Sequence, residues 1–133
     1  MKKVILLDEK CLEGQDGLKR VLDRNYSLYY FTGSDGVLEE IDRTMPDIVI
    51  LACERPGCGA VEVCSDIKGD PLTNDTPVLV LSKMGGLMQI ENALRAGVDS
   101  YVVMPAPEAM ILDRIAAVLE KYSGRKVPEP ISL

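Results

Sequence analysis

The side chains best suited to chemistry near the start of the chain are the adjacent carboxylates Asp8 and Glu9. Two neighbouring carboxylates repel each other, and the repulsion is relieved by proton uptake, by a bound cation or by a basic group such as Lys10, Arg55 or Lys83. Carboxylate oxygens are also ligands that hard divalent cations accept. The pair therefore predicts either a weak divalent cation site or two solvated carboxylates in a loop.

Three cysteines form a second group of reactive side chains. Cys11 lies at the start of a predicted helix, Cys53 directly after a predicted strand, and Cys58 in the loop before the next helix. A helix N-terminus lowers the pKa of a nearby thiol, so a gathering of these residues on one rim would favour a thiol- or metal-responsive switch. Against this, the spacing from Cys53 to Cys58 is not a tight zinc or iron–sulfur spacing, and Cys64 has the pattern of an ordinary buried helix residue. The chain has no histidine, which excludes histidine-based acid–base catalysis and mixed Cys/His zinc sites.

The stretch from Pro46 to Cys64 is predicted to form a strand, a loop and a helix that place these side chains. Residues 48–51 form a short apolar run rich in β-branched side chains, typical of a strand buried on both faces. The run stops at Ala52, and the turn signal Arg55-Pro56-Gly57 follows before a helix can start. In an open parallel sheet ligands bind beyond the carboxyl ends of the strands, so we expect Ala52 and the loop after it at the functional rim.

Apolar runs alternate with helical patterns along the whole chain, which implies right-handed crossovers and an α/β fold with a five-stranded doubly wound parallel sheet. Gly97 is suited to a left-handed helix C-cap. We expect a single domain at residues 1–123, followed by a Pro-containing tail or the start of a linker at residues 124–133. The predicted strands cover residues 3–7, 27–31, 48–51, 78–81 and 98–103, and the predicted helices cover 12–24, a segment from about 37, 60–68, 87–96 and 107–121.

The composition is that of one domain with one core, since 47% of the 133 residues are hydrophobic. A net charge of -6 without a basic cluster argues against binding to nucleic acid or to a membrane surface. No apolar run approaches the roughly 20 residues needed to span a bilayer, and the N-terminal residues have no signal-peptide pattern. We therefore expect a cytoplasmic protein with reduced thiols.

The order of several short motifs resembles the receiver domain of two-component response regulators. Each motif is weak alone, whereas their order and spacing together are specific. The resemblance implies a CheY-like, flavodoxin-like (βα)5 fold with strand order 2-1-3-4-5. It runs from Lys2 to about Tyr122 and rests on Asp8-Glu9, Pro46-Asp47, Pro56-Gly57, Pro77, Ala93-Leu94-Arg95-Ala96-Gly97, Asp99-Ser100-Tyr101 and Pro105.

The same resemblance implies phosphoryl transfer from a histidine kinase to an aspartate at the end of the third strand. In this family a divalent metal held partly by the acidic pair, a hydroxyl after the fourth strand and a lysine after the fifth strand assist the transfer. By position the acidic pair is Asp8 and Glu9 and the hydroxyl is Ser82, but the aspartate position holds Ala52 and the lysine position holds Met104. The resemblance therefore predicts a degenerate receiver that is not an enzyme. It has no cofactor, or at most a weakly bound divalent cation at the acidic pair.

The two departures from the family are consistent as a pair. A lysine at position 104 without an aspartate at position 52, or an aspartate without the lysine, would be an unpaired charge. Apolar side chains at both positions avoid an unpaired charge. A replacement nucleophile is not evident, because Asp47 lies at the other end of the third strand and Glu54 lies in the loop. Ser82 is then expected to be a capping or loop hydroxyl, and Met104 a filler at the edge of the core. The resemblance implies a cis bond between Met104 and Pro105, because the family usually has a cis bond between its lysine and the following proline.

The leading interpretation is a receiver module that acts by phosphorylation-independent contact with signalling proteins, and the alternative is the thiol- or metal-responsive switch. The resembled family commonly forms dimers or meets targets through its fourth helix, fifth strand and fifth helix. Without a phosphoryl group to change its conformation, we expect Tyr101 to be packed against the protein or to face a partner. The predicted contacts use Tyr101 together with Met88, Glu91 and Arg95. The three helix residues are expected to face solvent, because the buried stripe of that helix is predicted to run through Leu87, Ile90, Leu94 and Gly97.

Overall fold

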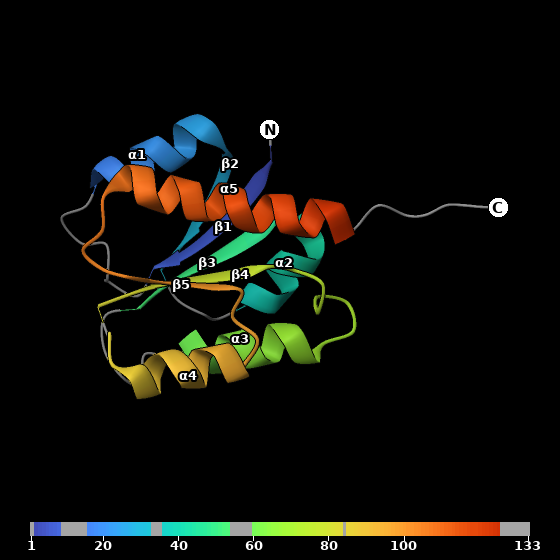
Figure 1. Ribbon diagram of the computed structural model, residues 1–133. Coiled ribbons are helices and arrows are strands. Elements are labelled where there is room, and N and C mark those ends of the chain that lie inside the picture. Colours follow the sequence, from blue (N-terminus) through green and yellow to red (C-terminus); the bar gives the residue numbers. More distant parts are fainter. Residues whose placement is uncertain (1, 9–15, 33–35, 54–59, 84, 126–133) are drawn as a thin grey trace.

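The protein is a five-stranded parallel sheet between two layers of helices (Figure 1). The computed structural model describes residues 2–8, 16–32, 36–53, 60–83 and 85–125. The sheet has the order β2-β1-β3-β4-β5, and each neighbouring pair is parallel. The predicted doubly wound topology is therefore confirmed. The strands are β1 (Lys3–Asp8), β2 (Ser27–Phe31), β3 (Ile48–Cys53), β4 (Val78–Ser82) and β5 (Ser100–Val103).

The inner strands are almost wholly apolar because helices cover both of their faces. Every residue of β4 is buried, whereas β2, at one edge of the sheet, is only partly buried. Parallel pairing brings the carboxyl ends of the strands together, so that Asp8 pairs with Ala52 and Cys53 pairs with Ser82. We call this side of the sheet, marked by Asp8, Ala52 and Ser82, the carboxyl edge.

Two helices cover one face of the sheet and three cover the other. α1 and α5 lie on the first face, and α2, α3 and α4 lie on the second (Figure 1). Among the described residues, no helix is both long enough and apolar enough to cross a membrane. The helices are α1 (Asp16–Asn25), α2 (Val37–Thr44), α3 (Ala60–Gly69), α4 (Leu87–Arg95) and α5 (Glu108–Arg125).

The last helix is longer than the sequence predicts. α5 continues to Arg125, so the expected helix end at residue 121 is wrong. Tyr122, only 8% exposed, packs into the core and keeps the last turns of the helix against the sheet. This packing outweighs the low helix propensity of Gly124, which costs about 1 kcal/mol relative to alanine.

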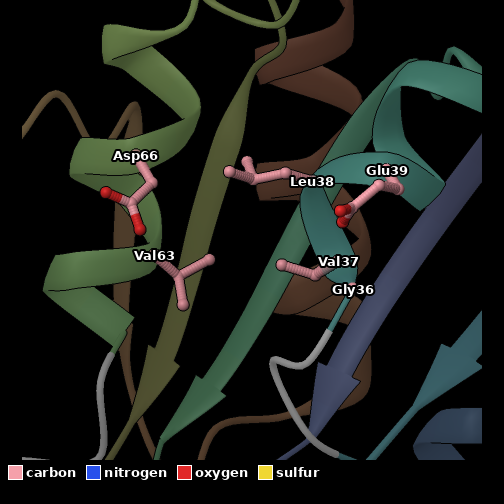
Figure 2. A pocket seen from close by; sticks show the side chains of 6 residues that line it. All are labelled: Gly36, Val37, Leu38, Glu39, Val63 and Asp66. Carbon is pink, nitrogen blue, oxygen red and sulfur yellow. The ribbon is translucent and has the colours of Figure 1, made fainter.

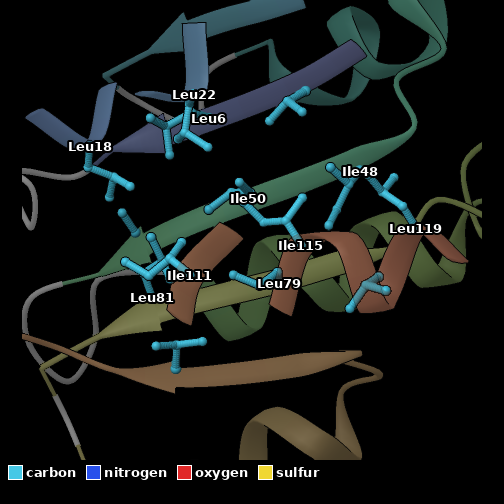
Figure 3. Packing of buried hydrophobic residues seen from close by; sticks show 14 of the residues in the cluster. Leu6, Leu18, Leu22, Ile48, Ile50, Leu79, Leu81, Ile111, Ile115 and Leu119 are labelled. Atoms are coloured by element: carbon cyan, nitrogen blue, oxygen red, sulfur yellow. The ribbon is translucent and has the colours of Figure 1, made fainter. Parts of the chain in front are cut away.

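The helices of each face pack over their own hydrophobic cluster. The first cluster lies under α1 and α5 and uses alternate residues of the strands, as the pleat of a sheet requires (Figure 3). Burial of one large aliphatic side chain contributes about 1.5–3 kcal/mol, so this cluster is a major source of stability. It contains Val4, Leu6, Leu18, Leu22, Ile48, Ile50, Ala52, Leu79, Leu81, Val102, Met104, Ile111, Ile115, Val118, Leu119 and Tyr122.

The second cluster lies under α2, α3 and α4 and takes the intervening strand residues. Val37 and Ile41 anchor α2 in it, and Leu38 packs against it as a partly buried side chain. The apolar spacing of residues 37, 38 and 41 thus gives α2 its buried side. The second cluster contains Ile5, Leu7, Val37, Ile41, Val49, Leu51, Val63, Cys64, Ile67, Val78, Val80, Ala93 and Val98.

The buried face of α4 differs from the prediction. The sequence places Leu87 and Leu94 in the buried stripe, but they are 74% and 53% exposed, and Ala93, only 1% exposed, packs against the sheet instead. A small side chain at the contact lets a short helix approach the strands closely, and apolar residues on both sides of this helix make its periodicity ambiguous. Ile90, which the prediction also places in the buried stripe, is half-buried. Gly97 has φ +102, the left-handed conformation predicted for the residue after the C-cap.

A largely buried ionic group joins α3 and α5 to the amino ends of β4 and β5. The Lys68 Nζ atom on α3 lies 3.1 Å from Asp99 Oδ2 and donates hydrogen bonds to Thr76 O at 2.9 Å and to Tyr122 Oη at 3.2 Å. Asp99 also accepts hydrogen bonds from the Tyr122 hydroxyl at 2.7 Å and from the Val78 N–H at 2.8 Å. A buried charge with this many partners is compensated, so the group fixes the last turns of α5 against the sheet.

The pKa of Lys68 reflects both its burial and its partners. Burial lowers the pKa of the Lys68 ammonium, but the hydrogen bond with Tyr122 and the attraction of Asp99 outweigh it and raise the pKa above 10.5. Because the folded pKa is raised, the stability that Lys68 contributes is fully present at neutral pH and is lost only as the pH rises through the folded pKa. The Lys68 stem also passes close to Gly97, where a Cβ atom would lie 2.9 Å from Lys68 Cγ.

We predict that Asp99→Ala lowers the free energy of unfolding by roughly 2–4 kcal/mol, because it leaves the ammonium of Lys68 without its counter-ion and the Val78 N–H without its acceptor. Urea denaturation measures the effect. The control is Asp23→Ala on the exposed side of α1, which should change stability by less than about 0.5 kcal/mol. Equal losses for the two variants would contradict a stabilising role for the group.

Candidate functional site

The carboxyl edge brings together the described residues at the predicted positions of the phosphoryl-transfer site. Asp8 at the end of β1 pairs with Ala52 on β3, and Ser82 ends β4 beside Cys53. Met104 follows β5, and its backbone N–H donates a hydrogen bond to Ser82 O at 2.7 Å. The peptide bond from Met104 to Pro105 is cis, as predicted. Glu9 lies outside the described residues.

The centre of this edge is apolar. Ala52 and Met104 are 2% and 4% exposed, and both belong to the first cluster, together with Leu81. Alternate residues of a strand share a face, so Ala52 continues the line of Ile48 and Ile50 toward the end of the sheet. The hydrophobic core therefore extends to the position where the resembled family carries its aspartate and lysine.

Asp8 is the buried carboxylate next to this apolar centre. It is only 4% exposed, and its Oδ2 atom accepts a hydrogen bond from the Tyr30 hydroxyl at 2.9 Å. The Lys19 ammonium on α1 in turn donates a hydrogen bond to the Tyr30 oxygen at 3.2 Å and lies 4.5 Å from the centroid of the Tyr30 ring. The alternative of a fully solvated Asp8 is therefore wrong, because strand pairing places this residue inside the protein.

Tyr30 and Lys19 are site residues that the sequence interpretation missed. In the folded sheet Tyr30 pairs in register with Leu6, so it shares a face of the sheet with Asp8, two residues further along β1. The register of two strands follows from the folded sheet and cannot be read with certainty from either strand alone. The rest of α1 and the start of β2 separate Lys19 from Tyr30 along the chain, so their contact depends on how α1 packs against the sheet.

Ser82 occupies a different environment from the apolar centre. It is 2% exposed and follows Val78 and Val80, which belong to the second cluster, so alternation places it on the face under α2, α3 and α4. Ser82 is therefore a buried strand residue, and the expected loop position is wrong.

The predicted cation site pairs Asp8 with Glu9, and of the two only Asp8 lies within the described residues. A divalent cation requires several oxygen ligands, and magnesium requires near-octahedral geometry. Within the described ranges no group of three or more His, Cys, Asp or Glu side chains could hold a metal ion. Asp8 alone, buried and hydrogen-bonded to Tyr30, does not fit such an ion.

The cysteines provide no described cluster. Cys11 and Cys58 lie outside the described residues, and Cys53 is part of β3. Cys64, which is buried on α3, approaches Ala96 O at 3.5 Å. Burial, opposed in part by Lys68, raises the pKa of the Cys64 thiol to about 11. This cysteine is therefore unreactive at neutral pH, in agreement with its predicted structural role.

Exposed apolar side chains gather on α4, β5 and α5, which we call the α4-β5-α5 surface. Glu91 and Arg95 are exposed among them, as predicted, and Tyr101 is half-buried against the second cluster. Arg114 on α5 lies 3.3 Å from Ser100 Oγ and 3.5 Å from Tyr101 O, so it joins the helix to β5. The exposed apolar residues are Leu87 at 74%, Met88 at 70%, Leu94 at 53%, Val103 at 42% and Met110 at 38%.

A small pocket lies on the face of the sheet covered by α2, α3 and α4, away from Asp8. It has a volume of about 150 Å³ and opens between α2 and α3 (Figure 2). Asp8, Ala52 and Met104 do not line it, so it is separate from the site described above. Its lining residues are Gly36, Val37, Leu38, Glu39, Val63 and Asp66.

No protein-family model matches the chain. The chain is similar to the "Probable transcriptional regulator ycf27" of Guillardia theta, with 31% identity over 125 residues that cover 90% of this chain and 46% of that protein. It thus spans slightly less than half the length of this relative.

Two solved structures are similar in fold. One is a CheY-like response regulator receiver domain protein from Methanospirillum hungatei JF-1, with a TM-score of 0.80, 16% identity, and coverage of 94% of this chain and 98% of that one. The other is the receiver domain of the sensor histidine kinase PA1611 from Pseudomonas aeruginosa PAO1, with magnesium coordinated in its active-site cleft. Here the TM-score is 0.76, the identity 16%, and the coverage 90% of this chain and 98% of that one.

We predict that Ala52→Asp destabilises the protein by about 3 kcal/mol or more in the absence of divalent metal, because it introduces a second buried carboxylate beside Asp8 in an apolar environment and the two charges repel each other. Met104→Lys alone should also destabilise. The double variant should melt at a higher temperature than Ala52→Asp, since the two introduced charges compensate each other. Melting midpoints measured with a chelator test this, and equal midpoints for Ala52→Asp and the double variant would contradict the charge argument.

Proposed function

Because this chain is a receiver (CheY-like) domain of the response-regulator type, we propose that it acts in signal transduction by standing protein–protein contact rather than by phosphoryl transfer. The observation on which the proposal depends is the apolar pair Ala52 and Met104 at the carboxyl edge. An alanine offers no oxygen to accept a phosphoryl group. A methionine offers no positive charge to stabilise one.

No described side chain takes over as acceptor. Asp47 lies at the amino end of β3, where it accepts a hydrogen bond from the Lys3 N–H at 2.8 Å, so the length of the strand separates it from the carboxyl edge. Ser82 is buried on the other face of the sheet. In-line transfer tolerates little misplacement, which argues against either residue. Glu54 lies outside the described residues.

The proposal therefore describes a receiver that is not an enzyme and that requires no cofactor. A receiver that cannot be phosphorylated must use a surface present in its resting state. The α4-β5-α5 surface is suited to this, because methionine and arginine are enriched where proteins meet and Met88 and Arg95 are both exposed there. We propose that this surface binds a second copy of the chain or another signalling protein.

The thiol- or metal-responsive switch remains a weaker alternative. Two of its cysteines, Cys11 and Cys58, are outside the described residues, and the described Cys64 is buried with a raised thiol pKa. The relatives extend well beyond the receiver, so the activity of the whole protein, its pathway and its output are further proposals. A cytoplasmic location belongs to the same proposal.

We predict that Leu87→Asp weakens self-association about tenfold or more, because a charge would replace an apolar side chain at the centre of a contact. Leu87 is 74% exposed in the protomer, so the melting midpoint of the variant should differ little from that of the parent protein. Sedimentation equilibrium with increasing protein concentration measures the association constant.

The matched control is Leu72→Asp, which introduces the same charge at a leucine that is 75% exposed in the loop between α3 and β4. It should leave association unchanged. Equal weakening by both variants would indicate a nonspecific effect of charge, and a monomeric parent protein at all concentrations would show that the homodimer is wrong.

A further inference from the structure

Three elements meet through polar side chains beside the apolar centre of the carboxyl edge. Asp8 comes from β1, Tyr30 from β2 and Lys19 from α1. The Tyr30 hydroxyl donates to Asp8 Oδ2 at 2.9 Å, and the Lys19 ammonium donates to the Tyr30 oxygen at 3.2 Å. The three groups therefore form a directed series in which positive charge on Lys19 polarises the hydroxyl that binds the carboxylate.

The series provides what a buried carboxylate requires. Asp8 is 4% exposed, so its charge has lost most of its solvation and needs hydrogen bonds or a nearby cation. The Tyr30 hydroxyl supplies the hydrogen bond. Lys19 supplies positive charge in the same neighbourhood, and it is held over the Tyr30 ring by a cation–π contact of 4.5 Å.

We propose that Tyr30 and Lys19 take the place of a divalent cation at Asp8 and so hold the carboxyl edge in one standing arrangement. This inference deepens the proposed function, on which it rests. In the receiver domain of PA1611 a magnesium ion is coordinated in the active-site cleft. In this chain one oxygen of Asp8 already accepts a hydrogen bond, and Ala52 supplies no second carboxylate.

The charges and the ligand geometry at Asp8 disfavour a bound divalent cation. A magnesium ion demands several oxygen ligands at short distance, and the described residues offer no cluster of that kind. An ion at Asp8 would compete with the Tyr30 hydroxyl for the carboxylate and would be repelled by the ammonium of Lys19. Tyr30 and Lys19 are thus positioning residues for Asp8, and through it they join α1 and β2 to β1.

The first experiment titrates the parent protein with Mn²⁺ and records paramagnetic broadening of backbone amide signals. We expect the amides of Leu7 and Asp8 to show no saturable broadening. Saturable broadening centred on them would overturn the inference. It would not overturn the proposed function, which fails only if a phosphoryl donor modifies the protein, so the two failures are distinguishable.

The second experiment is a double-mutant cycle that tests whether the three side chains act together. Tyr30→Phe should raise the equilibrium constant of unfolding about tenfold or more, because it removes a hydrogen bond to a buried charge. In an Asp8→Ala background the same substitution should have little effect. Lys19→Met should follow the same pattern with a smaller change.

The matched control is Tyr29→Phe, which removes a hydroxyl from the neighbouring residue of β2 on the opposite face of the sheet, where the side chain is 37% exposed. It should leave the unfolding constant nearly unchanged in both backgrounds. Equal effects of Tyr30→Phe with and without Asp8 would overturn the inference, because the tyrosine would then stabilise the protein by another contact.

Discussion

The continuity of the first cluster up to the carboxyl edge is the constraint on which the rest of the structure depends. Ala52 and Met104 are core residues here, packed with Leu81 under α5. Charged groups at these two positions would interrupt the core unless they compensated each other. Since both are apolar, Asp8 is left beside the core, and its charge must be balanced by nearby groups. Tyr30 and Lys19 supply that balance and thereby connect the chemistry of the edge to the docking of α1.

The other end of the sheet is fixed by a second compensated charge. Lys68, Asp99 and Tyr122 join α3, the start of β5 and the end of α5 through short hydrogen bonds. The two polar groups therefore stand at opposite ends of the same sheet, and each holds helices against strands. A protein that binds its partner without a trigger requires such fixed anchors, because its binding surface must already be in place.

The sequence predicts most of the fold, because buried parallel strands are continuous apolar runs and the motifs of the receiver family mark the strand ends. It also predicts that Ala52 and Met104 meet at one edge. It does not predict which side of α4 is buried, since Ala93 and Leu94 give nearly equivalent apolar stripes and only tertiary packing distinguishes them. Nor does it predict Tyr30 at Asp8, because that contact depends on strand register. Glu9, Cys11 and Cys58 lie outside the described residues, so their predicted roles stay predictions.

The central claim is that this receiver fold functions without phosphoryl transfer, and intact-protein mass spectrometry after incubation with acetyl phosphate and magnesium tests it most directly. The account predicts an unchanged mass, because Ala52 offers no acceptor and the described residues provide no substitute at the carboxyl edge. The same treatment of a receiver that has the aspartate and the lysine serves as the positive control. A phosphoryl adduct on this chain that is labile to base and to hydroxylamine, as an acyl phosphate is, would contradict the account.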